Sequence, residues 1–165
     1  MFAGYRRRYP ELAAAWDAWH SPEIPRELEK DNELWQIPDK PAATRVSSGD
    51  IMQVVARHLP NLVGGSADLN ASTKTYLKGY GDFQAGNRKG NNLYFGVREH
   101  AMGAIASGIS LHGGLRPYAS TFLVFFDYMK PPVRLAAMMG LPVIYIFTHD
   151  SFSVGEDGPT HQPVE

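Results

Sequence analysis

The feature that most constrains the fold is a continuous apolar run close to the C-terminal end of the chain. Residues 143–147 read Val-Ile-Tyr-Ile-Phe and follow Pro142 directly. An unbroken run of this length, rich in β-branched and aromatic residues, is typical of a strand that is buried on both faces. Helices must cover both sides of a sheet that contains such a strand, so the run predicts an α/β protein.

Strand and helix patterns alternate along the rest of the chain. The other expected strands span residues 61–65, 93–97 and 117–121. The expected helices span residues 9–20, 47–59, 99–111 and 122–139. This alternation predicts a parallel sheet with helices on both faces. It also places glycine and polar residues after the strands, where ligands bind in sheets of this kind.

Local signals add detail to three of these elements. A Gly-Gly turn is expected where the strand over residues 61–65 ends. Ser47 or Ser48 is expected to cap the next helix along the sequence. The helix over residues 122–139 is expected to break near Pro131 and Pro132, because proline lacks the N–H that a helix needs. The capped helix has a set of apolar residues expected on one face: Ile51, Val54, Val55 and Leu59.

A proline-rich, charged segment divides the chain. Residues 22–41 read as a connecting segment. The expected organisation is therefore a first part over residues 1–41, which ends a preceding domain and links it onward, and a second domain over residues 42–165. Within that domain, residues 73–92 are rich in Gly, Lys and Asn and are expected to form the most mobile loop.

Composition excludes several classes of function. The chain has 16 Lys and Arg against 17 Asp and Glu, so no strong overall field attracts nucleic acid or a membrane surface. It has no cysteine, which excludes disulfides, thiol nucleophiles and cysteine-based metal sites and is compatible with a reducing cytoplasm. No signal peptide and no apolar run long enough to span a membrane is present, so a cytoplasmic protein is expected.

Two candidate sites arise at the strand ends. Glu99 lies where a strand meets a helix, so its carboxylate can point out of the carboxyl edge of the sheet. The alternative is an ordinary first-turn charge beside a helix terminus. Phe122, Phe125 and Tyr128 are spaced by three residues and would form an aromatic stripe on a helix. Such a stripe usually packs in the core.

Polar residues in the glycine-rich segments form a further group of candidates. His149 follows the apolar run, and Asp157 and His161 lie in a Gly-Pro-rich loop, so the three can converge on a polyhydroxylated substrate. Asp68 follows two glycines and otherwise suits an Asx turn or a cap. The two histidines are otherwise expected to have structural roles. Their spacing, with no obvious third ligand, does not indicate a zinc site.

Three motifs together resemble transketolase. They read Gly-Gly-Ser-Ala-Asp-Leu at 64–69, Gly-Val-Arg-Glu-His-Ala-Met at 96–102, and Thr-His-Asp-Ser at 148–151 followed by Gly-Glu-Asp-Gly-Pro-Thr-His-Gln-Pro at 155–163. The resemblance implies a pyrimidine-binding domain of the thiamine diphosphate-dependent type, truncated at its C-terminal end. It also implies that the chain is an internal fragment and inactive alone. The diphosphate and metal ligands would lie in a missing first domain.

The resemblance also implies roles for individual residues. Glu99 would bind the ring nitrogen of the aminopyrimidine, and His161 would lie near the reacting carbon as a second catalytic residue. The remaining cofactor contacts would come from Phe122, Phe125, Tyr128 and Asp68. The sugar phosphate would be bound by Arg45, Ser72, His149, Asp157 and His161.

The implied activity is transfer of a two-carbon ketol unit from a ketose phosphate to an aldose phosphate, in the pentose phosphate pathway or the Calvin cycle. The implied cofactors are thiamine diphosphate and Mg²⁺ or another divalent cation such as Ca²⁺. The implied assembly is a homodimer whose sites are shared between subunits. Two alternatives remain open from the sequence: an enzyme similar to dihydroxyacetone synthase, and a non-catalytic α/β module that pairs with another chain.

Overall fold

The computed structural model describes residues 2–153 and 157–163. At its centre lies a parallel sheet with the strand order β2-β1-β3-β4. The strands are β1 (Leu62–Ser66), β2 (Asn92–Tyr94), β3 (Arg116–Phe122) and β4 (Ile144–Thr148). All neighbouring pairs are parallel, so the carboxyl ends of the strands meet at one edge.

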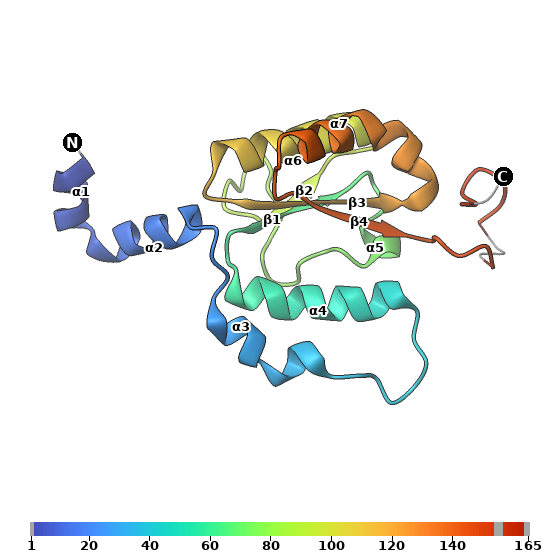
Figure 1. Cartoon of the computed structure of the whole chain (residues 1–165), viewed down its shortest axis with the longest axis horizontal. Helices are drawn as coiled ribbons and strands as arrows, with labels where there is room; N and C mark the ends of the chain where they lie inside the picture. Colours follow the sequence, from blue (N-terminus) through green and yellow to red (C-terminus); the bar gives the residue numbers. More distant parts are fainter. Residues whose placement is uncertain (1, 154–156, 164–165) are drawn as a thin grey trace.

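Helices cover both faces of the sheet, which confirms the α/β prediction. Helix α4 (Thr44–His58) lies on one face, and α6 (Glu99–His112) and α7 (Phe126–Met138) lie side by side on the other (Figure 1). Shorter helical segments complete the described fold: α1 (Phe2–Arg8), α2 (Pro10–His20), α3 (Arg26–Lys30), η1 (Asn32–Trp35), α5 (Asn70–Thr73) and η2 (Leu123–Phe125).

The core has two layers because successive residues of a strand point to opposite faces. On β3, Tyr118 packs with the α4 layer and Ala119 packs with the α6–α7 layer. The α4 layer is built around buried apolar side chains such as Met52, Leu62 and Leu77. The opposite layer is the buried set Ala67, Phe95, Met102, Ala106, Ala119 and Met129.

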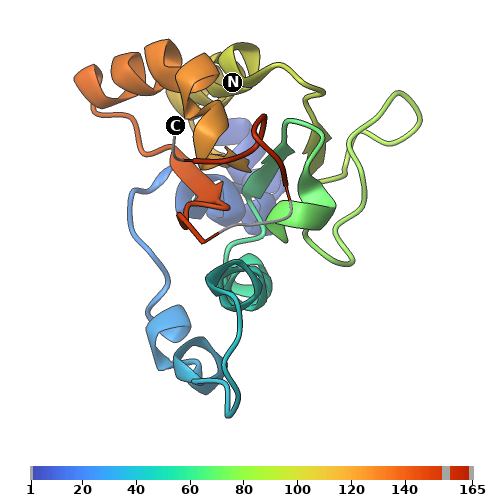
Figure 2. The same cartoon turned by 90° about the vertical axis from the view of Figure 1, so that its right-hand side faces the viewer.

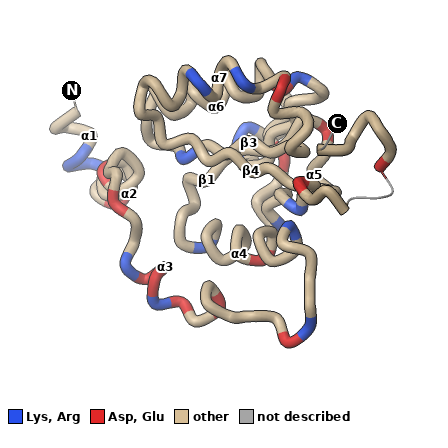
Figure 3. The backbone as a smooth tube through the Cα atoms, turned by 45° about the vertical axis from the view of Figure 1, so that its right-hand side comes forward, with Lys and Arg blue, Asp and Glu red and all other residues tan. Residues whose placement is uncertain are grey.

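Helices α1 and α2 extend away from the sheet at the left of Figure 1, whereas α3 and η1 lie along α4, where Leu28 is buried in the α4 layer. Arg116 of β3 anchors the segment directly after α2 to the sheet. Its Nη2 donates hydrogen bonds to the carbonyls of Ser21 and Glu23 at 3.0 and 2.7 Å. Basic and acidic residues are interleaved along this segment (Figure 3). Over the described residues, no helix is both long and apolar enough to cross a membrane.

The expected Gly-Gly turn after the first strand is wrong, because Gly64 and Gly65 are both strand residues of β1. Each lies against the backbone of a neighbouring strand. A Cβ at Gly64 would collide with the carbonyl oxygen of Tyr118, and a Cβ at Gly65 would collide with that of Leu93. These glycines therefore allow close approach between strands rather than a reversal of the chain.

The expected cap of α4 is also wrong. The helix begins at Thr44, so Ser47 and Ser48 lie inside its first turns. Its buried face also differs in part from the expected one, because Ile51 is 42% exposed. Val54 is buried as expected, and the other residues that α4 buries are Gly49, Met52 and Ala56.

The expected break near the two prolines does not occur, since α7 continues through Pro131 and Pro132. Tertiary packing outweighs the missing backbone hydrogen bonds. Pro132 is buried against Gly103 of α6, where a Cβ would come within 2.8 Å of the proline Cγ. The start of the expected helix is likewise different, because Phe122 ends β3 and Phe125 ends η2.

Two other expectations change. The expected burial of the apolar run on both faces is wrong, because β4 lies at the edge of the described sheet. Ile144 is 44% exposed, Val143 and residues 145–147 are half-buried, and only Thr148 of this strand is buried. The loop over residues 73–92 is anchored by the buried Asn92. Its amide accepts from Leu77 N at 2.8 Å and donates to the carbonyls of Leu77 and Gly81 at 2.9 and 3.0 Å.

Candidate functional site

The candidate residues gather at the carboxyl edge of the sheet, which faces the viewer in Figure 2. Asp68 follows β1, Glu99 begins the helix after β2, and His149 follows β4. Phe125 and Tyr128 come from the segment after β3. The topology therefore brings residues from four separate stretches of the sequence to one edge, as ligand sites in parallel sheets require.

One cavity of about 600 Å³ opens at this edge and is called the Glu99 cavity. Its lining residues are Ala67, Asp68, Leu69, Val97, Glu99, Phe125, Tyr128 and His161. Five of these were candidates from the sequence. The lining contains two carboxylates, two aromatic rings and an imidazole but no Lys or Arg, so the cavity suits a flat heteroaromatic group better than a phosphate.

Glu99 is the first residue of α6 and is only 6% exposed. Within the described part of the chain, its carboxylate has no side-chain hydrogen bond or ion pair. The neighbouring Arg98 does not supply one, because its Nη1 donates to the carbonyl of Phe95 at 2.9 Å. A buried carboxylate is costly unless it is hydrogen-bonded, so its exposure to the cavity indicates a group that a ligand completes.

The aromatic stripe is real, although it crosses three elements instead of lying on one helix. The rings of Phe122 and Phe125 have centroids 6.0 Å apart at an interplanar angle of 15°. Those of Phe125 and Tyr128 are 6.2 Å apart at 29°. Phe122 is 4% exposed and lies behind the cavity, whereas Phe125 and Tyr128 line it and Tyr128 is 64% exposed.

Asp68 lies in a tight turn with left-handed backbone geometry, at a φ of 64°. Aspartate tolerates this conformation better than most residues. The turn is held by Ser66, whose Oγ accepts a hydrogen bond from Leu69 N at 2.7 Å. The cap of this turn is therefore Ser66, which the sequence analysis did not single out, and the exposed Asp68 side chain remains available to the cavity.

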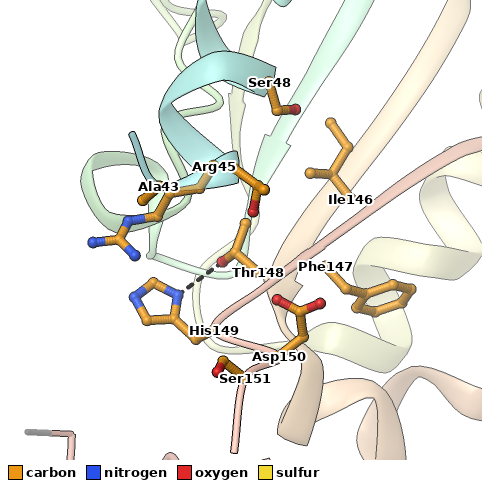
Figure 4. Close-up of a pocket in the computed structure, with 10 residues that line it drawn as sticks. Ala43, Arg45, Ser48, Ile146, Phe147, Thr148, His149, Asp150 and Ser151 are labelled. Atoms are coloured by element: carbon orange, nitrogen blue, oxygen red, sulfur yellow. Dashed lines mark hydrogen bonds between the residues drawn. The ribbon is translucent and has the colours of Figure 1, made fainter. Parts of the chain in front are cut away.

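A second cavity of about 350 Å³, called the Arg45 cavity, lies between the first turns of α4 and the end of β4. Figure 4 shows the Arg45 guanidinium and the His149 imidazole on the same side of it. Its polar lining comes from Thr44, Arg45, Ser48, Thr148, His149, Asp150 and Ser151. A guanidinium, an imidazole and several hydroxyls together suit an anionic, hydroxylated ligand.

Burial lowers the pKa of His149 below its ordinary value of 6.5, and the positive charge of Arg45 lowers it further. Asp157 acts in the opposite direction, with its Oδ2 at 3.9 Å from the imidazole Nε2. The Nδ1 atom lies 2.9 Å from Thr148 Oγ1. His149 is therefore oriented by a hydroxyl and favours the uncharged state near neutral pH, so Arg45 is the permanent cation of this cavity.

Phe122 links the two cavities. Its ring stacks on His149, which lines the Arg45 cavity, and meets His161, which lines the Glu99 cavity, at a centroid distance of 5.8 Å and 71°. His161 also contacts Phe125 edge-on at 5.2 Å. His149 and His161 therefore both contact Phe122, and Asp157 lies beside His149, although the two histidines line different cavities.

Three candidates line neither cavity: Phe122, Asp157 and Ser72. Phe122 and Asp157 each lie against His149, which lines the Arg45 cavity. Ser72 is exposed on α5.

Conversely, two hydroxyls were not predicted from the sequence: that of Ser66, which accepts from Leu69 N in the turn that contains Asp68, and that of Thr148, which contacts His149 Nδ1. The available signal was their position as the last residues of β1 and β4. In residues 2–153 and 157–163, no group of three His, Asp or Glu side chains is placed to hold a metal ion.

Comparisons with known proteins give the family. Residues 40–165 match the family described as "Transketolase, pyrimidine binding domain". The whole chain is 51% identical to the transketolase of Bacillus subtilis (strain 168) and covers 25% of it. A crystal structure of Pichia stipitis transketolase in complex with sedoheptulose-7-phosphate matches 99% of this chain and 25% of its own, with a TM-score of 0.88 and 39% identity.

The transketolase of Leishmania mexicana gives a TM-score of 0.87 at 42% identity, over 99% of this chain and 24% of its own. The chain thus spans about a quarter of the length of the relatives it matches. These matches confirm the resemblance that the three motifs indicated. Because residues 40–165 match the family model and the chain has the parallel sheet described above, the chain belongs to the transketolase pyrimidine-binding domain family.

Proposed function

We propose that this chain is one part of a transketolase and supplies the pyrimidine-binding side of a thiamine diphosphate site. The observation that carries the proposal is the buried carboxylate of Glu99, which opens onto a cavity walled by Phe125 and Tyr128. The matched relatives are named transketolase, which favours this activity over a dihydroxyacetone synthase and over a non-catalytic module.

The residues of the Glu99 cavity fit one half of the cofactor. Stacked aromatic rings suit a flat pyrimidine, and a carboxylate without a protein partner suits a ring nitrogen that exchanges a proton. The absence of Lys and Arg from this lining does not suit a diphosphate. The diphosphate and its divalent cation, Mg²⁺ or Ca²⁺, are therefore assigned to residues outside this chain.

When bound, thiamine diphosphate supplies the carbon nucleophile that accepts a two-carbon unit from a ketose. The residues of this chain prepare that chemistry. Glu99 would hold the proton at the pyrimidine ring nitrogen, and the rings of Phe125 and Tyr128, packed against Phe122, would orient the pyrimidine and exclude water. Asp68, in the turn after β1, would contact the remaining part of the cofactor.

The Arg45 cavity is proposed as the binding site for the phosphate of a sugar. Arg45 supplies a permanent cation and His149 a hydrogen-bond donor. Asp157 would accept from a sugar hydroxyl, and His161 would lie near the reacting carbon because it lines the Glu99 cavity. Ser72 lines neither cavity, so its proposed contact with the substrate rests on the family resemblance alone. A sugar phosphate also appears in the name of the Pichia stipitis complex.

A homodimer is proposed because the surface around the Glu99 cavity exposes apolar side chains. Val97 and Tyr128, which line the cavity, are 76% and 64% exposed, and Ile105, farther along α6, is 48% exposed. Exposed apolar groups gathered near one site mark a surface that another subunit covers. Replacing Ile105 by Glu should shift the sedimentation of the full-length protein toward the monomer. The same change at Ile37, which is 88% exposed in the segment before α4, should not.

The remaining assignments follow from the proposed activity. The boundary between residues 1–41 and 42–165 would separate the end of a preceding domain and its linker from the pyrimidine-binding domain. A cytoplasmic enzyme of the pentose phosphate pathway or the Calvin cycle would use the phosphorylated sugars described above.

A chimera tests the proposed function directly. The chain replaces the matching quarter of the Bacillus subtilis transketolase, to which it is 51% identical. The expected result is transfer of a two-carbon unit between sugar phosphates that depends on added thiamine diphosphate. A chimera that folds, dimerises and shows no transfer would contradict the proposal.

A further inference from the structure

A chain of buried hydroxyls lies behind the Glu99 cavity. Thr73 and Thr75 are each 1% exposed, and Ser120 of β3 is fully buried. The Oγ1 atoms of Thr73 and Thr75 are 2.8 Å apart. Ser120 Oγ lies 2.7 Å from Thr75 Oγ1 and, in a longer contact, 3.4 Å from Thr73 Oγ1. None of these residues belongs to either cavity lining.

The hydroxyl chain joins the sheet to the turn that carries Asp68. At one end Ser120 donates to the carbonyl of Gly65 in β1 at 3.2 Å. At the other end Thr73 donates to the carbonyl of Leu69 at 3.0 Å. A hydroxyl group has only one proton to donate. Because Thr73 and Ser120 donate theirs to the two carbonyls, Thr75 donates its proton to the hydroxyl oxygen of either Thr73 or Ser120.

Leu69 is thereby held at both of its backbone groups. Its N–H donates to Ser66 Oγ, and its carbonyl accepts from the hydroxyl of Thr73 as well as from backbone N–H groups of α5. Leu69 lines the Glu99 cavity directly beside Asp68. The left-handed geometry of Asp68 requires support from its surroundings, because this conformation is sparsely populated for residues other than glycine.

We propose that Thr73, Thr75 and Ser120 are positioning residues that fix the turn over Ala67–Leu69 as a rigid wall of the Glu99 cavity. The network acts through Leu69 and does not touch the ligand. Its consequence for the cofactor rests on the proposed function, whereas its effect on the turn does not. Apolar residues of equal size would fill the same space. The hydroxyls differ from them because their directional hydrogen bonds hold the turn in one position relative to the sheet.

Thr75→Val tests the network because valine keeps the shape of threonine and removes the central hydroxyl. Thr75→Ser restores the hydroxyl and serves as the rescue variant. Thr121→Val is the matched control. Thr121 lies on β3 and is buried like Thr75, but its Oγ1 has no hydrogen-bond partner in the described structure. The first measurement is amide hydrogen exchange of Leu69 in the 165-residue chain, which needs no cofactor.

Thr75→Val should accelerate exchange of the Leu69 amide about tenfold, with Thr75→Ser and Thr121→Val close to the unaltered chain. In the chimera, Thr75→Val should raise the dissociation constant for thiamine diphosphate about tenfold and leave the KM for the sugar phosphate nearly unchanged. Equal Leu69 exchange in Thr75→Val and Thr121→Val would overturn the inference, as would faster exchange without weaker cofactor binding.

The two proposals fail separately. If the unaltered chimera neither bound thiamine diphosphate nor transferred the two-carbon unit, the proposed function would be wrong. Exchange at Leu69 would then decide by itself whether the hydroxyl chain anchors the turn.

Discussion

The imidazole of His149 stacks on the ring of Phe122 with their centroids 3.7 Å apart and their planes inclined by 27°. The sheet register explains the contact. Phe122 pairs with Thr148 across β3 and β4, and His149 then adopts a φ of 55° that folds its ring over Phe122. The strand pairing therefore fixes the position of a substrate-binding candidate relative to the aromatic wall of the Glu99 cavity.

Arg45 should contribute more than His149 to phosphate binding near neutral pH, because the lowered pKa leaves His149 uncharged. Arg45→Gln should raise the KM for a phosphorylated ketose by about 10- to 100-fold, and His149→Ala by about 2- to 10-fold. Steady-state kinetics of the chimera with phosphorylated and unphosphorylated ketoses measures both effects. Arg134→Gln, on the exposed side of α7, is the control. A larger effect of His149→Ala would contradict this assignment.

The pKa of His149 also predicts a pH dependence of stability. Since the folded-state pKa lies below 6.5, the unfolded chain binds this proton more readily, and acidification through the window just below 6.5 reduces the free energy of unfolding. His149→Gln removes this dependence. The difference in unfolding free energy between the unaltered chain and the variant should therefore shrink from about pH 7.5 to about pH 5. Urea titrations at both pH values measure it, and a constant difference would refute the prediction.

Two glycines of α6 should respond oppositely to alanine. At Gly103 a Cβ would lie 2.8 Å from Pro132 Cγ and 3.1 Å from Met129 Cγ, so Gly103→Ala should destabilise the chain by about 1–3 kcal/mol. Gly108 has no atom within 4 Å of such a Cβ, and Gly108→Ala should stabilise it by about 0.5–1 kcal/mol. Equilibrium unfolding of both variants checks the signs. Equal effects would show that α7 does not pack closely on α6.

The isolated chain should bind thiamine diphosphate weakly and show no transfer activity, because the Glu99 cavity offers no cation to the diphosphate. Its stacking rings supply only a fraction of the roughly 8 kcal/mol that a micromolar dissociation constant requires. Calorimetric titration in the presence of Mg²⁺ measures this affinity. A dissociation constant of about 1 μM or tighter would mean that the chain holds more of the cofactor than proposed.

The pattern of apolar residues predicted the fold, because each strand or helix shows its own periodicity within a short stretch of sequence. Contacts between separate strands and helices could not be predicted from this periodicity. Gly64 and Gly65 resemble a turn, and only the adjoining strands show why a side chain is excluded there. Pro131 and Pro132 resemble a helix break, and only the groove beside Gly103 shows why the helix continues.

The candidate site was predictable to a similar extent. The spacing of Phe122, Phe125 and Tyr128 indicated a set of neighbouring rings, although their backbone is not one helix. Ser66 was missed because its role depends on the left-handed turn at Asp68, which no periodicity reports.

The central claim is that Glu99 is the proton partner of the cofactor, and Glu99→Gln in the chimera tests it most directly. Glutamine preserves size and an acceptor but cannot exchange the acid proton. Glu11→Gln is the matched control, since Glu11 is an exposed acid in the first turn of α2. The measurement is deuterium exchange at C2 of the bound thiazolium, stopped by rapid acid quench. The account predicts a rate about 10²- to 10⁴-fold lower for Glu99→Gln, with the KM for the ketose changed far less. Exchange at the rate of the unaltered chimera would contradict it.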